Sequence, residues 1–268
     1  MNDLLLSVII PVYNAQDSLP IALNSVFSQG IDSMEVILID DGSKDDSLAV
    51  CEQFAKRDQR VKVLSQANAG PGAARNAGLK ISRGRYVCFV DSDDLLTEGA
   101  LPKMLQMMKK DQPDLLIAHF NILMNNQSYD RGYIKDDRLM NRRDFFHALS
   151  HRPGSYYYSA LWNKLYCGDI IRKHHLFFDD SYAWGEDFEF NMRYYHYVNS
   201  VSFLKDPVYN YKRTYSGQTW RTMFEFGDSL KIKARLYRAL KRLYHKAGLL
   251  SQYRIYIFRY IFNVTIST

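Results

Sequence analysis

The chain has 268 residues, of which 24% are charged and 47% hydrophobic, a composition that excludes intrinsic disorder and indicates a folded protein with a sizeable core. Its length allows one large domain or two small ones. The net charge of +6 is uneven, because residues 205–268 carry 13 Lys or Arg and 3 Asp or Glu, a net of +10, whereas residues 1–204 carry a net of −4. This distribution argues against a uniformly basic nucleic-acid-binding protein and indicates a slightly acidic body with a basic C-terminal segment.

Strand-like and helix-like patterns alternate over the first 120 residues. Short apolar, β-branched runs predict strands, and apolar residues at steps of three and four predict helices between them. The strands are expected at residues 7–11, 35–40, 61–64, 86–90 and 114–120, and the helices at about 17–29, 45–57 and 72–84. This alternation predicts the α/β class, with a mostly parallel central sheet that is flanked by helices and joined by right-handed crossovers.

The pattern after residue 120 is less regular. Residues 121–204 are rich in aromatic side chains and contain a helix-like stretch near 186–195. From 228 to 247 the apolar residues again recur at steps of three or four, which predicts a long helix. Asp228 is suited to cap the start of this helix, and Gly248 to follow its end.

Acidic side chains follow two of the predicted strands at their carboxyl ends. The second strand ends at Asp41, and the run Asp91-Ser92-Asp93-Asp94 follows the fourth, which is apolar throughout and so expected to be buried on both faces. Ligands of open parallel sheets bind beyond these strand ends. A single Asp in such a place is commonly a turn former or helix cap, which describes Asp94 equally well. Asp91 and Asp93 together indicate a divalent cation, because hard cations take oxygen ligands and relieve the repulsion between carboxylates.

A glycine-containing loop leads into the third helix, which carries Arg75 in its first turn. Gly70 and Gly72 allow a ligand to approach the backbone, and the start of a helix favours an anion, so Arg75 is a candidate phosphate contact. The loop is not a dinucleotide-binding fingerprint, because it follows the third strand and Arg75 stands where a third glycine is needed. A flexible turn without a ligand is the simpler interpretation.

A second acidic pair, Glu186 and Asp187, lies in the first turn of a predicted helix. Carboxylates are favourable there through the helix dipole alone. Trp184 and Phe188 flank the pair, so one carboxylate is also a candidate general base in an aromatic-lined pocket. Farther along the chain, residues 209–213 are expected either to return toward the phosphate-binding region as a strand or loop, or to be solvent-facing.

Seven segments occur in a recognisable order: SVIIPVYN, SVFSQ, EVILIDDGSKDDS, NAGPGAARNAGL, YVCFVDSDD, WNKLY and GEDFEF. Together they closely resemble the family 2 glycosyltransferases of the GT-A fold, of the bacterial type that builds lipopolysaccharide, O-antigen or capsule. The resemblance covers about residues 5–215 and implies a Rossmann-like, mostly parallel sheet. It suggests a catalytic domain of residues 1–215, with a nucleotide-sugar half (about 1–120) and an acceptor half (about 121–215), followed by a basic, helical C-terminal extension of residues 216–268.

The resemblance also implies roles for the residues that match the nucleotide site. Pro11, Tyr13 and Asp41 resemble the pocket for the nucleotide base, with Tyr13 stacked on uracil and Asp41 hydrogen-bonded to it. Asn68 and Arg75 resemble further nucleotide contacts.

The acidic motifs receive their roles from the same resemblance. Asp91-Ser92-Asp93 resembles the DxD motif, with Asp91 toward the ribose and Asp93 as the direct ligand of Mn²⁺ or Mg²⁺ at the diphosphate. Asp187 resembles the catalytic base, with Glu186 beside it. The segment WNKLY, residues 162–166, is expected either to line the floor of the acceptor pocket or, through Trp162, to serve in packing.

The function that the resemblance implies is inverting transfer of a hexose or N-acetylhexosamine from a UDP-sugar to a hydroxyl of a glycan, lipid-linked or lipopolysaccharide acceptor. The residues agree with it, since a cation and Arg75 offset charge on the leaving diphosphate and a positioned carboxylate accepts the proton. A non-catalytic nucleotide-sugar or glycan-binding module on the same fold is an alternative, although intact Asp93 and Asp187 argue against it. A nucleic-acid-binding protein that uses the basic tail is a third, although no nucleic-acid-binding module is recognisable.

The tail and the cysteines bear on where the protein resides. Aromatic residues and arginines alternate at 253–260, a pattern that suits the surface of an anionic membrane leaflet, and the alternative is a helix packed on the catalytic domain with a solvated basic face. Cys51, Cys88 and Cys167 form no CxxC pair, which indicates reduced thiols. With neither a signal-peptide pattern nor an apolar run of about 18 residues, the chain is expected in the cytoplasm, with any membrane contact peripheral on the inner membrane.

Overall fold

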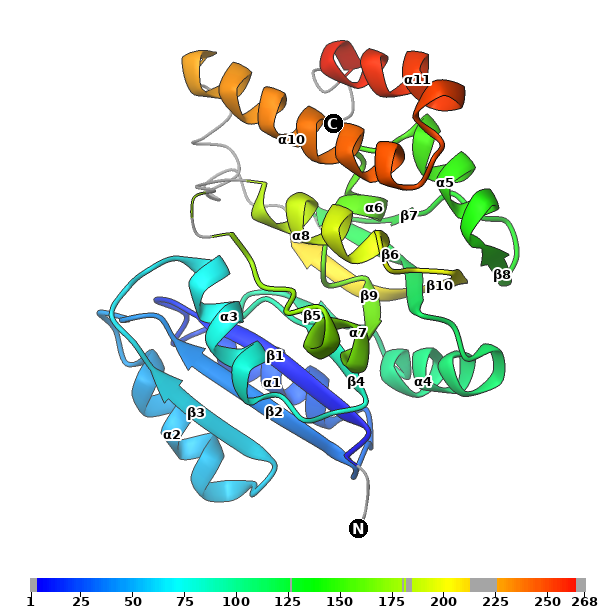
Figure 1. Ribbon diagram of the computed structural model, residues 1–268. Coiled ribbons are helices and arrows are strands. Elements are labelled where there is room, and N and C mark those ends of the chain that lie inside the picture. The colour runs from blue at the N-terminus through cyan, green and yellow to red at the C-terminus, as the bar shows by residue number, and fades with distance from the viewer. Residues whose placement is uncertain (1–3, 126, 180, 182–184, 213–225, 264–268) are drawn as a thin grey trace.

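The computed structural model describes residues 4–125, 127–179, 181, 185–212 and 226–263 (Figure 1). Its strands are β1 (Leu6–Val12), β2 (Met34–Asp40), β3 (Val61–Ser65), β4 (Tyr86–Phe89), β5 (Leu95–Leu96), β6 (Leu115–Met124), β7 (Gln127–Arg131), β8 (Arg138–Asn141), β9 (Lys164–Cys167) and β10 (Ser200–Lys212). Its helices are α1 (Leu19–Phe27), α2 (Ser47–Arg57), α3 (Pro71–Ile81), α4 (Ala100–Asp111), α5 (Arg142–His151), α6 (Tyr156–Ser159), α7 (Gly168–Lys173), α8 (Glu186–Tyr195), α10 (Phe226–Lys246) and α11 (Leu250–Asn263).

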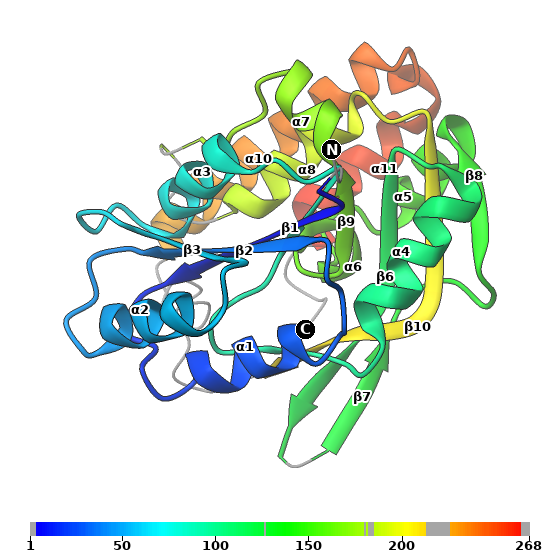
Figure 2. The same ribbon diagram turned by 90° about the horizontal axis from the view of Figure 1, so that it is seen from below.

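The N-terminal half of the sheet is parallel. Its strands follow the order β3-β2-β1-β4, and Val8 of β1 pairs with Val36 of β2 on one side and with Cys88 of β4 on the other. In Figure 2, α1 and α2 lie on one face of these strands and α3 on the other. Because helices cover both faces, every residue of β2 is buried. The α/β class is confirmed in this half as the alternation of strands and helices predicts it.

The other half of the sheet is mixed. β9 lies antiparallel between β4 and β6, β6 pairs in parallel with β10, and β5, β7 and β8 add antiparallel pairs. The predicted parallel pairing thus holds for β1 to β4 and for β6 with β10. β7 is antiparallel to β6 because only residues 125 and 126 separate the two strands, too few for the crossover that a parallel neighbour needs.

Helices α10 and α11 form a hairpin that covers α8 and α5 (Figure 1). Leu240 and Leu243 of α10 are buried against the rest of the chain. The hydroxyl of Tyr244 donates a hydrogen bond of 2.6 Å to the main-chain oxygen of Phe146 in α5. At least this part of the basic extension is therefore packed on the body.

The predicted helices in the C-terminal part agree with the structure to within two residues. α8 covers residues 186–195 as predicted. α10 begins at Phe226, so Asp228 lies inside the helix, and its side chain is outside the described part of the structure. Gly248 follows α10 with a φ of +71°, the left-handed conformation that favours glycine. Among the described residues, no helix is both long enough and apolar enough to cross a membrane.

Candidate active site

Three segments that are far apart in the sequence meet at Arg75 of α3. Its Nη2 lies 3.0 Å from Oδ1 of Asp91, the second residue after β4. Its Nη1 lies 3.1 Å from Oδ1 of Asp187 and 3.4 Å from Oε1 of Glu186, at the start of α8. Arg75 is buried, with 5% of its surface exposed. The fold therefore gathers Asp91, one of the two carboxylates predicted to hold a cation, and the predicted base around one guanidinium group.

The charges in this cluster act on one another strongly. Burial alone would lower the pKa of Arg75, but the three carboxylates around it raise that pKa above its ordinary value. Burial raises the pKa of Asp187, Arg75 offsets this in part, and the two neighbouring carboxylates raise it further, so that the pKa stays above the usual range of an aspartate. A carboxylate of this kind is a stronger proton acceptor than an ordinary one.

The last residues of β10 hold the segment that follows β4. The backbone N–H of Asp91 donates to the hydroxyl of Tyr209 at 3.0 Å, and the backbone N–H of Lys212 donates to Oδ1 of Asp94 at 2.8 Å. Burial, followed by the charges of Asp91 and Asp93, raises the pKa of Asp94 to about 8. Asp94 thus binds the backbone of β10 and does not cap α4, whose cap residue is a glycine.

The donor set at this strand end fits a hard divalent cation. Within the described ranges, no three His, Cys, Asp or Glu side chains form a ready-made metal site. Mg²⁺, however, is commonly held by one or two carboxylates, with substrate phosphates and water as its other ligands. Asp91 and Asp93 offer two such carboxylates, and Asp93 is exposed. Ser92 between them is half-buried.

Aromatic rings pack beside the Tyr209 hydroxyl. Trp162 stacks on Tyr209 and on Tyr211, with ring centroids 4.6 and 5.5 Å apart and interplanar angles of 10° and 13°. Trp162 is only 5% exposed, so these are packing contacts. The predicted return of the chain to this region occurs as strand β10 up to Lys212, whereas Arg213 and Trp184 lie outside the described residues.

Asp41, which follows β2, fastens the loop that precedes α3. Its carboxylate accepts hydrogen bonds from the side chain of Gln66 at 2.7 Å and from the backbone N–H groups of Ala69 and Gly70 at 2.9 and 2.8 Å. The side-chain amide of Asn68 donates to the main-chain oxygen of Asp41 at 2.9 Å. Two of the predicted nucleotide contacts, Asp41 and Asn68, therefore lie together and order this loop.

The remaining predicted nucleotide contacts lie at the carboxyl end of β1. Pro11 is half-buried within the strand, and Tyr13 directly after it is 41% exposed. The backbone N–H of Asp41 donates to the main-chain oxygen of Val12 at 2.8 Å, which ties the ends of β1 and β2 together. An exposed aromatic ring in this place is available to stack on a planar ligand.

Two residues that the sequence analysis did not connect with Asp187 lie near it. Asn191, one turn farther along α8, donates to the main-chain oxygen of Asp187 at 2.9 Å and accepts from the hydroxyl of Tyr166 at 2.8 Å. Lys164 is fully buried, donates to the main-chain oxygen of Tyr157 at 3.0 Å, and lowers the pKa of Asp187. Asn191 could have been identified from the sequence because it lies four residues after Asp187, on the same face of the helix. Lys164 could have been identified because it is a lysine within an aromatic, apolar segment.

We expect Gly42→Ala to displace the loop that precedes α3. Gly42 has a φ of +70°, and a Cβ atom there would lie 2.8 Å from the backbone nitrogen of Asn68. Because a clash with backbone adds to the strain of the left-handed conformation, the free energy of unfolding should fall by about 2–4 kcal/mol in urea denaturation. Gly30→Ala is the matched control, since its φ is +65° and nothing lies within 4 Å of the added atom. It should cost about 1 kcal/mol, and equal losses in the two variants would contradict the close approach.

Comparison with known proteins identifies the family. The sequence profile of Glycosyl transferase family 2 matches residues 7–161. The chain is 28% identical over 209 residues to the uncharacterized glycosyltransferase EpsJ of Bacillus subtilis (strain 168) and 32% identical over 238 residues to EpsH of the same strain, a glycosyltransferase by name. These matches cover 78% and 84% of this chain, and the chain spans 61% and 66% of the length of those relatives.

A solved structure shares the fold. The crystal structure of residues 1–349 of S. aureus TarS in complex with UDP-GlcNAc superposes with a TM-score of 0.76 at 24% sequence identity. The match covers 95% of this chain and 72% of that one. The architecture is therefore the GT-A fold that the sequence motifs predict. Since the family profile matches more than half of the chain, the chain belongs to glycosyl transferase family 2.

Proposed function

We propose that the chain is a metal-dependent, inverting glycosyltransferase that moves a hexose or N-acetylhexosamine from a UDP-sugar to a hydroxyl of a glycan acceptor. The observation that carries the proposal is the bridge from Arg75 to Asp91 on one side and to Asp187 on the other. A transferase needs its diphosphate site and its proton acceptor within reach of a single sugar, and this bridge sets that arrangement. The likeness to TarS, which holds UDP-GlcNAc, supports a uridine nucleotide.

The nucleotide is bound at the carboxyl ends of β1 and β2. Tyr13 is 41% exposed and stacks on the base. Asp41 and Asn68 hold the loop before α3, so this loop borders the nucleotide in a fixed conformation. Preordering of the loop lowers the entropy that binding would otherwise cost.

The diphosphate lies at Asp91 and Asp93, which are the residues that would hold Mn²⁺ or Mg²⁺. When bound, the cation neutralises charge on the departing diphosphate. Asp91 is held from two sides, by Arg75 at its carboxylate and by Tyr209 at its backbone N–H. Arg75 also offsets the repulsion between Asp91 and the carboxylates of α8.

Asp187 acts as the general base. It takes the proton of the acceptor hydroxyl, whose oxygen forms a bond to the anomeric carbon while the bond from that carbon to the diphosphate oxygen breaks. The raised pKa makes Asp187 a competent acceptor of this proton. Asn191 donates to the main-chain oxygens of Asp187 and Ser159, which holds the first turn of α8 beside α6, and Glu186 is the neighbouring carboxylate.

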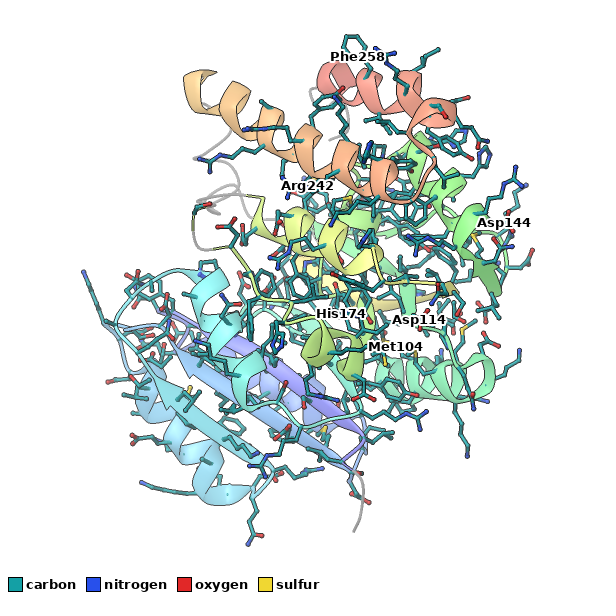
Figure 3. All side chains as sticks on the ribbon, viewed as in Figure 1. Met104, Asp114, Asp144, His174, Arg242 and Phe258 are labelled. Atoms are coloured by element: carbon teal, nitrogen blue, oxygen red, sulfur yellow. The ribbon has the colours of Figure 1, made fainter. Side chains whose placement is uncertain are left out.

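The acceptor is a lipid-linked or lipopolysaccharide intermediate in the synthesis of bacterial surface polysaccharide, reached from the cytoplasmic face of the inner membrane. On α11, Ile255 and Phe258 are 68% and 52% exposed, and Arg254 is exposed beside them. Figure 3 shows Phe258 on the outer side of this helix. Exposed apolar side chains next to basic ones suit peripheral binding to an anionic leaflet.

A donor screen tests the proposal. UDP-, GDP- and dTDP-sugars are offered to the full chain with and without EDTA, and metal-dependent release of the nucleotide is measured. We expect turnover with UDP-sugars only, and a loss of about 10²-fold or more in Asp93→Asn, because a metal ligand is removed. Asp136→Asn removes an equal charge at an exposed position of the β7–β8 connection and should keep full activity.

Two outcomes would contradict the proposal. Full activity of Asp93→Asn in the presence of EDTA would exclude the proposed metal site. Binding of UDP with neither hydrolysis nor transfer to any acceptor would instead indicate a non-catalytic binding module.

A further inference from the structure

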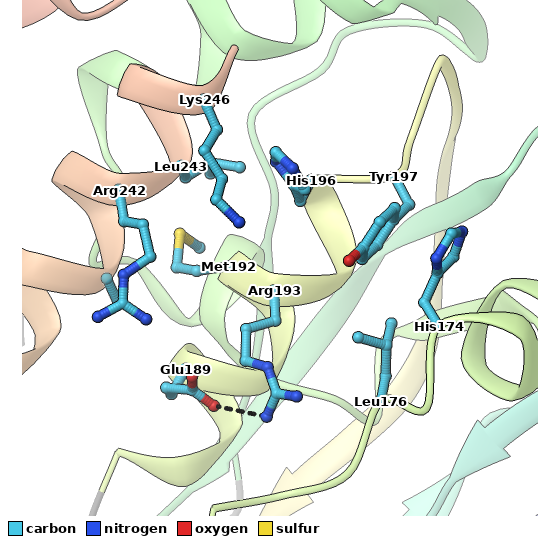
Figure 4. A pocket seen from close by; sticks show the side chains of 11 residues that line it. His174, Leu176, Glu189, Met192, Arg193, His196, Tyr197, Arg242, Leu243 and Lys246 are labelled. Carbon is cyan, nitrogen blue, oxygen red and sulfur yellow. Dashed lines mark ion pairs between the residues drawn. The ribbon is translucent and has the colours of Figure 1, made fainter.

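A cavity of about 150 Å³ lies between α8, α10 and the segment that follows α7 (Figure 4). Three residues of α8 line it, Glu189, Met192 and Arg193, and so does His196, which directly follows the helix. Their spacing of three, four and seven residues places them on one face of the helix. Asp187 lies on the opposite face, because two residues turn a helix by about 200°. The cavity is therefore separate from the proposed active site.

The facing side of the cavity comes from α10 with the same spacing. Ala239, Arg242, Leu243 and Lys246 line it, and they also share one helix face. Contacts between two helices of a globular protein are usually apolar. Here Arg242 and Lys246 are exposed at the mouth of the cavity, and Figure 4 shows both beside Met192 of α8.

The charges that line the cavity do not balance. Arg193 lies 3.7 Å from Glu189, the only carboxylate among the lining residues. Among the ion pairs between described residues, none includes Arg242 or Lys246. The lining thus carries three cations and one anion, an excess of positive charge around a concave surface, which focuses a positive potential.

One buried polar atom in the lining, Nδ1 of His196, also has no hydrogen-bond partner among the described residues. Burial and then the charge of Lys246 lower the pKa of His196, which agrees with a positive potential at this place. A neutral imidazole can donate one hydrogen bond to a bound group.

We propose that this cavity binds a phosphate group. The guanidinium group of Arg242 offers a planar pair of donors that matches phosphate oxygens, and Lys246 adds a second cation. Arg193 adds a third charge, although its Nη1 also donates to the main-chain oxygen of Phe177 at 2.8 Å. A space of about 150 Å³ is enough for one phosphate with a few water molecules. The bound phosphate connects α10 to α8. Asp187 lies in the first turn of α8, about 9 Å along the helix axis from Arg193.

Binding of inorganic phosphate to the full chain tests the proposal, by titration calorimetry at constant ionic strength. We expect saturable binding that weakens by about tenfold or more in the double variant Arg242→Gln/Lys246→Gln. The matched control is Arg238→Gln/Lys241→Gln, which removes the same charge from the same helix at residues that do not line the cavity. The control should bind within about twofold of the wild type.

Glu189→Gln provides a gain-of-binding test. Removing the only carboxylate of the lining should tighten phosphate binding several-fold, a result that a purely structural role of these residues would not produce. No saturable binding by the wild type at about 20 mM phosphate, or equal weakening in the two double variants, would overturn the proposal. UDP binding is measured in parallel and should stay unchanged, so that a failure here is distinct from a failure of the proposed glycosyl transfer.

Vesicles that contain phosphatidylglycerol distinguish the two sources of the phosphate. If inorganic phosphate displaces the wild type from vesicles and only the Arg242/Lys246 double variant fails to sediment with them, the ligand is a lipid headgroup. If phosphate binds to the cavity while both double variants sediment equally, the ligand is a free phosphorylated compound. Either result supports the site, whereas phosphate binding that is retained in the Arg242/Lys246 double variant overturns it.

Discussion

Asp187→Asn should lower kcat by about 10³-fold, because the amide cannot accept the proton of the acceptor hydroxyl. The KM for the donor should change little, since the amide oxygen can still accept from Arg75, 3.1 Å away in the native chain. In the wild type, kcat should rise with pH and level off above the usual range of an aspartate, because the base acts only when deprotonated and burial raises its pKa. This rise of kcat with pH should be absent in Asp187→Asn.

Glu186→Gln is the control for the assignment within the acidic pair. Its carboxylate lies farther from Arg75, at 3.4 Å, and should affect kcat by about tenfold or less. A variant Asp187→Asn that keeps more than about a tenth of the wild-type kcat would contradict its role as the base. If Glu186→Gln instead loses the pH-dependent limb, the two carboxylates exchange roles.

Arg75→Met should reduce both stability and transfer. Three carboxylates would lose their common cation, and two of them, Asp91 and Asp187, have side chains that are 28% and 29% exposed. Breaking a fully buried pair costs about 3–5 kcal/mol, and partial exposure lowers this to about 2–3 kcal/mol. Urea denaturation at pH 7 measures the loss. Arg75→Lys keeps the positive charge but lacks the planar pair of donors, and it should recover part of the lost stability.

The pH dependence identifies the cause of that loss. Without Arg75 the folded-state pKa values of the clustered carboxylates rise, so the variant loses stability relative to the wild type as pH increases through those values. The difference between the two proteins should therefore shrink toward pH 4. Lys103→Met, which breaks an exposed pair with Asp206 at 2.5 Å, should cost less than about 1 kcal/mol. A loss in Arg75→Met that is the same at both pH values would point to packing alone.

The first 120 residues could be interpreted from the sequence because most elements there show a clear apolar run or a helical period. β2 has an apolar run over residues 36–39 and is entirely buried, and the buried residues of α1, at positions 19, 22, 23 and 26, recur at steps of three and four. α8 was predictable for the same reason. Between α4 and α8 several elements are short, since β8, α6 and β9 have four residues each. Such pieces carry no full period, and their partners in the sheet are set by contacts that are distant in the sequence.

The candidate site divides in the same way. The motifs alone identified Asp91, Asp93 and Asp187 as carboxylates with a chemical task, because residue type and position at a strand or helix end are local properties. They did not indicate that Arg75 lies between these carboxylates, since its partners lie 16 and more than 100 residues away. They also did not indicate that Lys164, in an aromatic segment, is fully buried and lowers the pKa of Asp187.

By itself, the sequence determined the class of fold, the family and the groups that carry charge, because these follow from periodicity, order and residue type. Only the tertiary structure decided how those groups pair. Arg75 meets three carboxylates because the first turns of α3 and α8 lie close to the residues that follow β4. The phosphate-sized cavity exists because two helix faces with the same spacing of three, four and seven residues meet. Neither face binds an anion alone, since the excess charge becomes concentrated only when the faces approach.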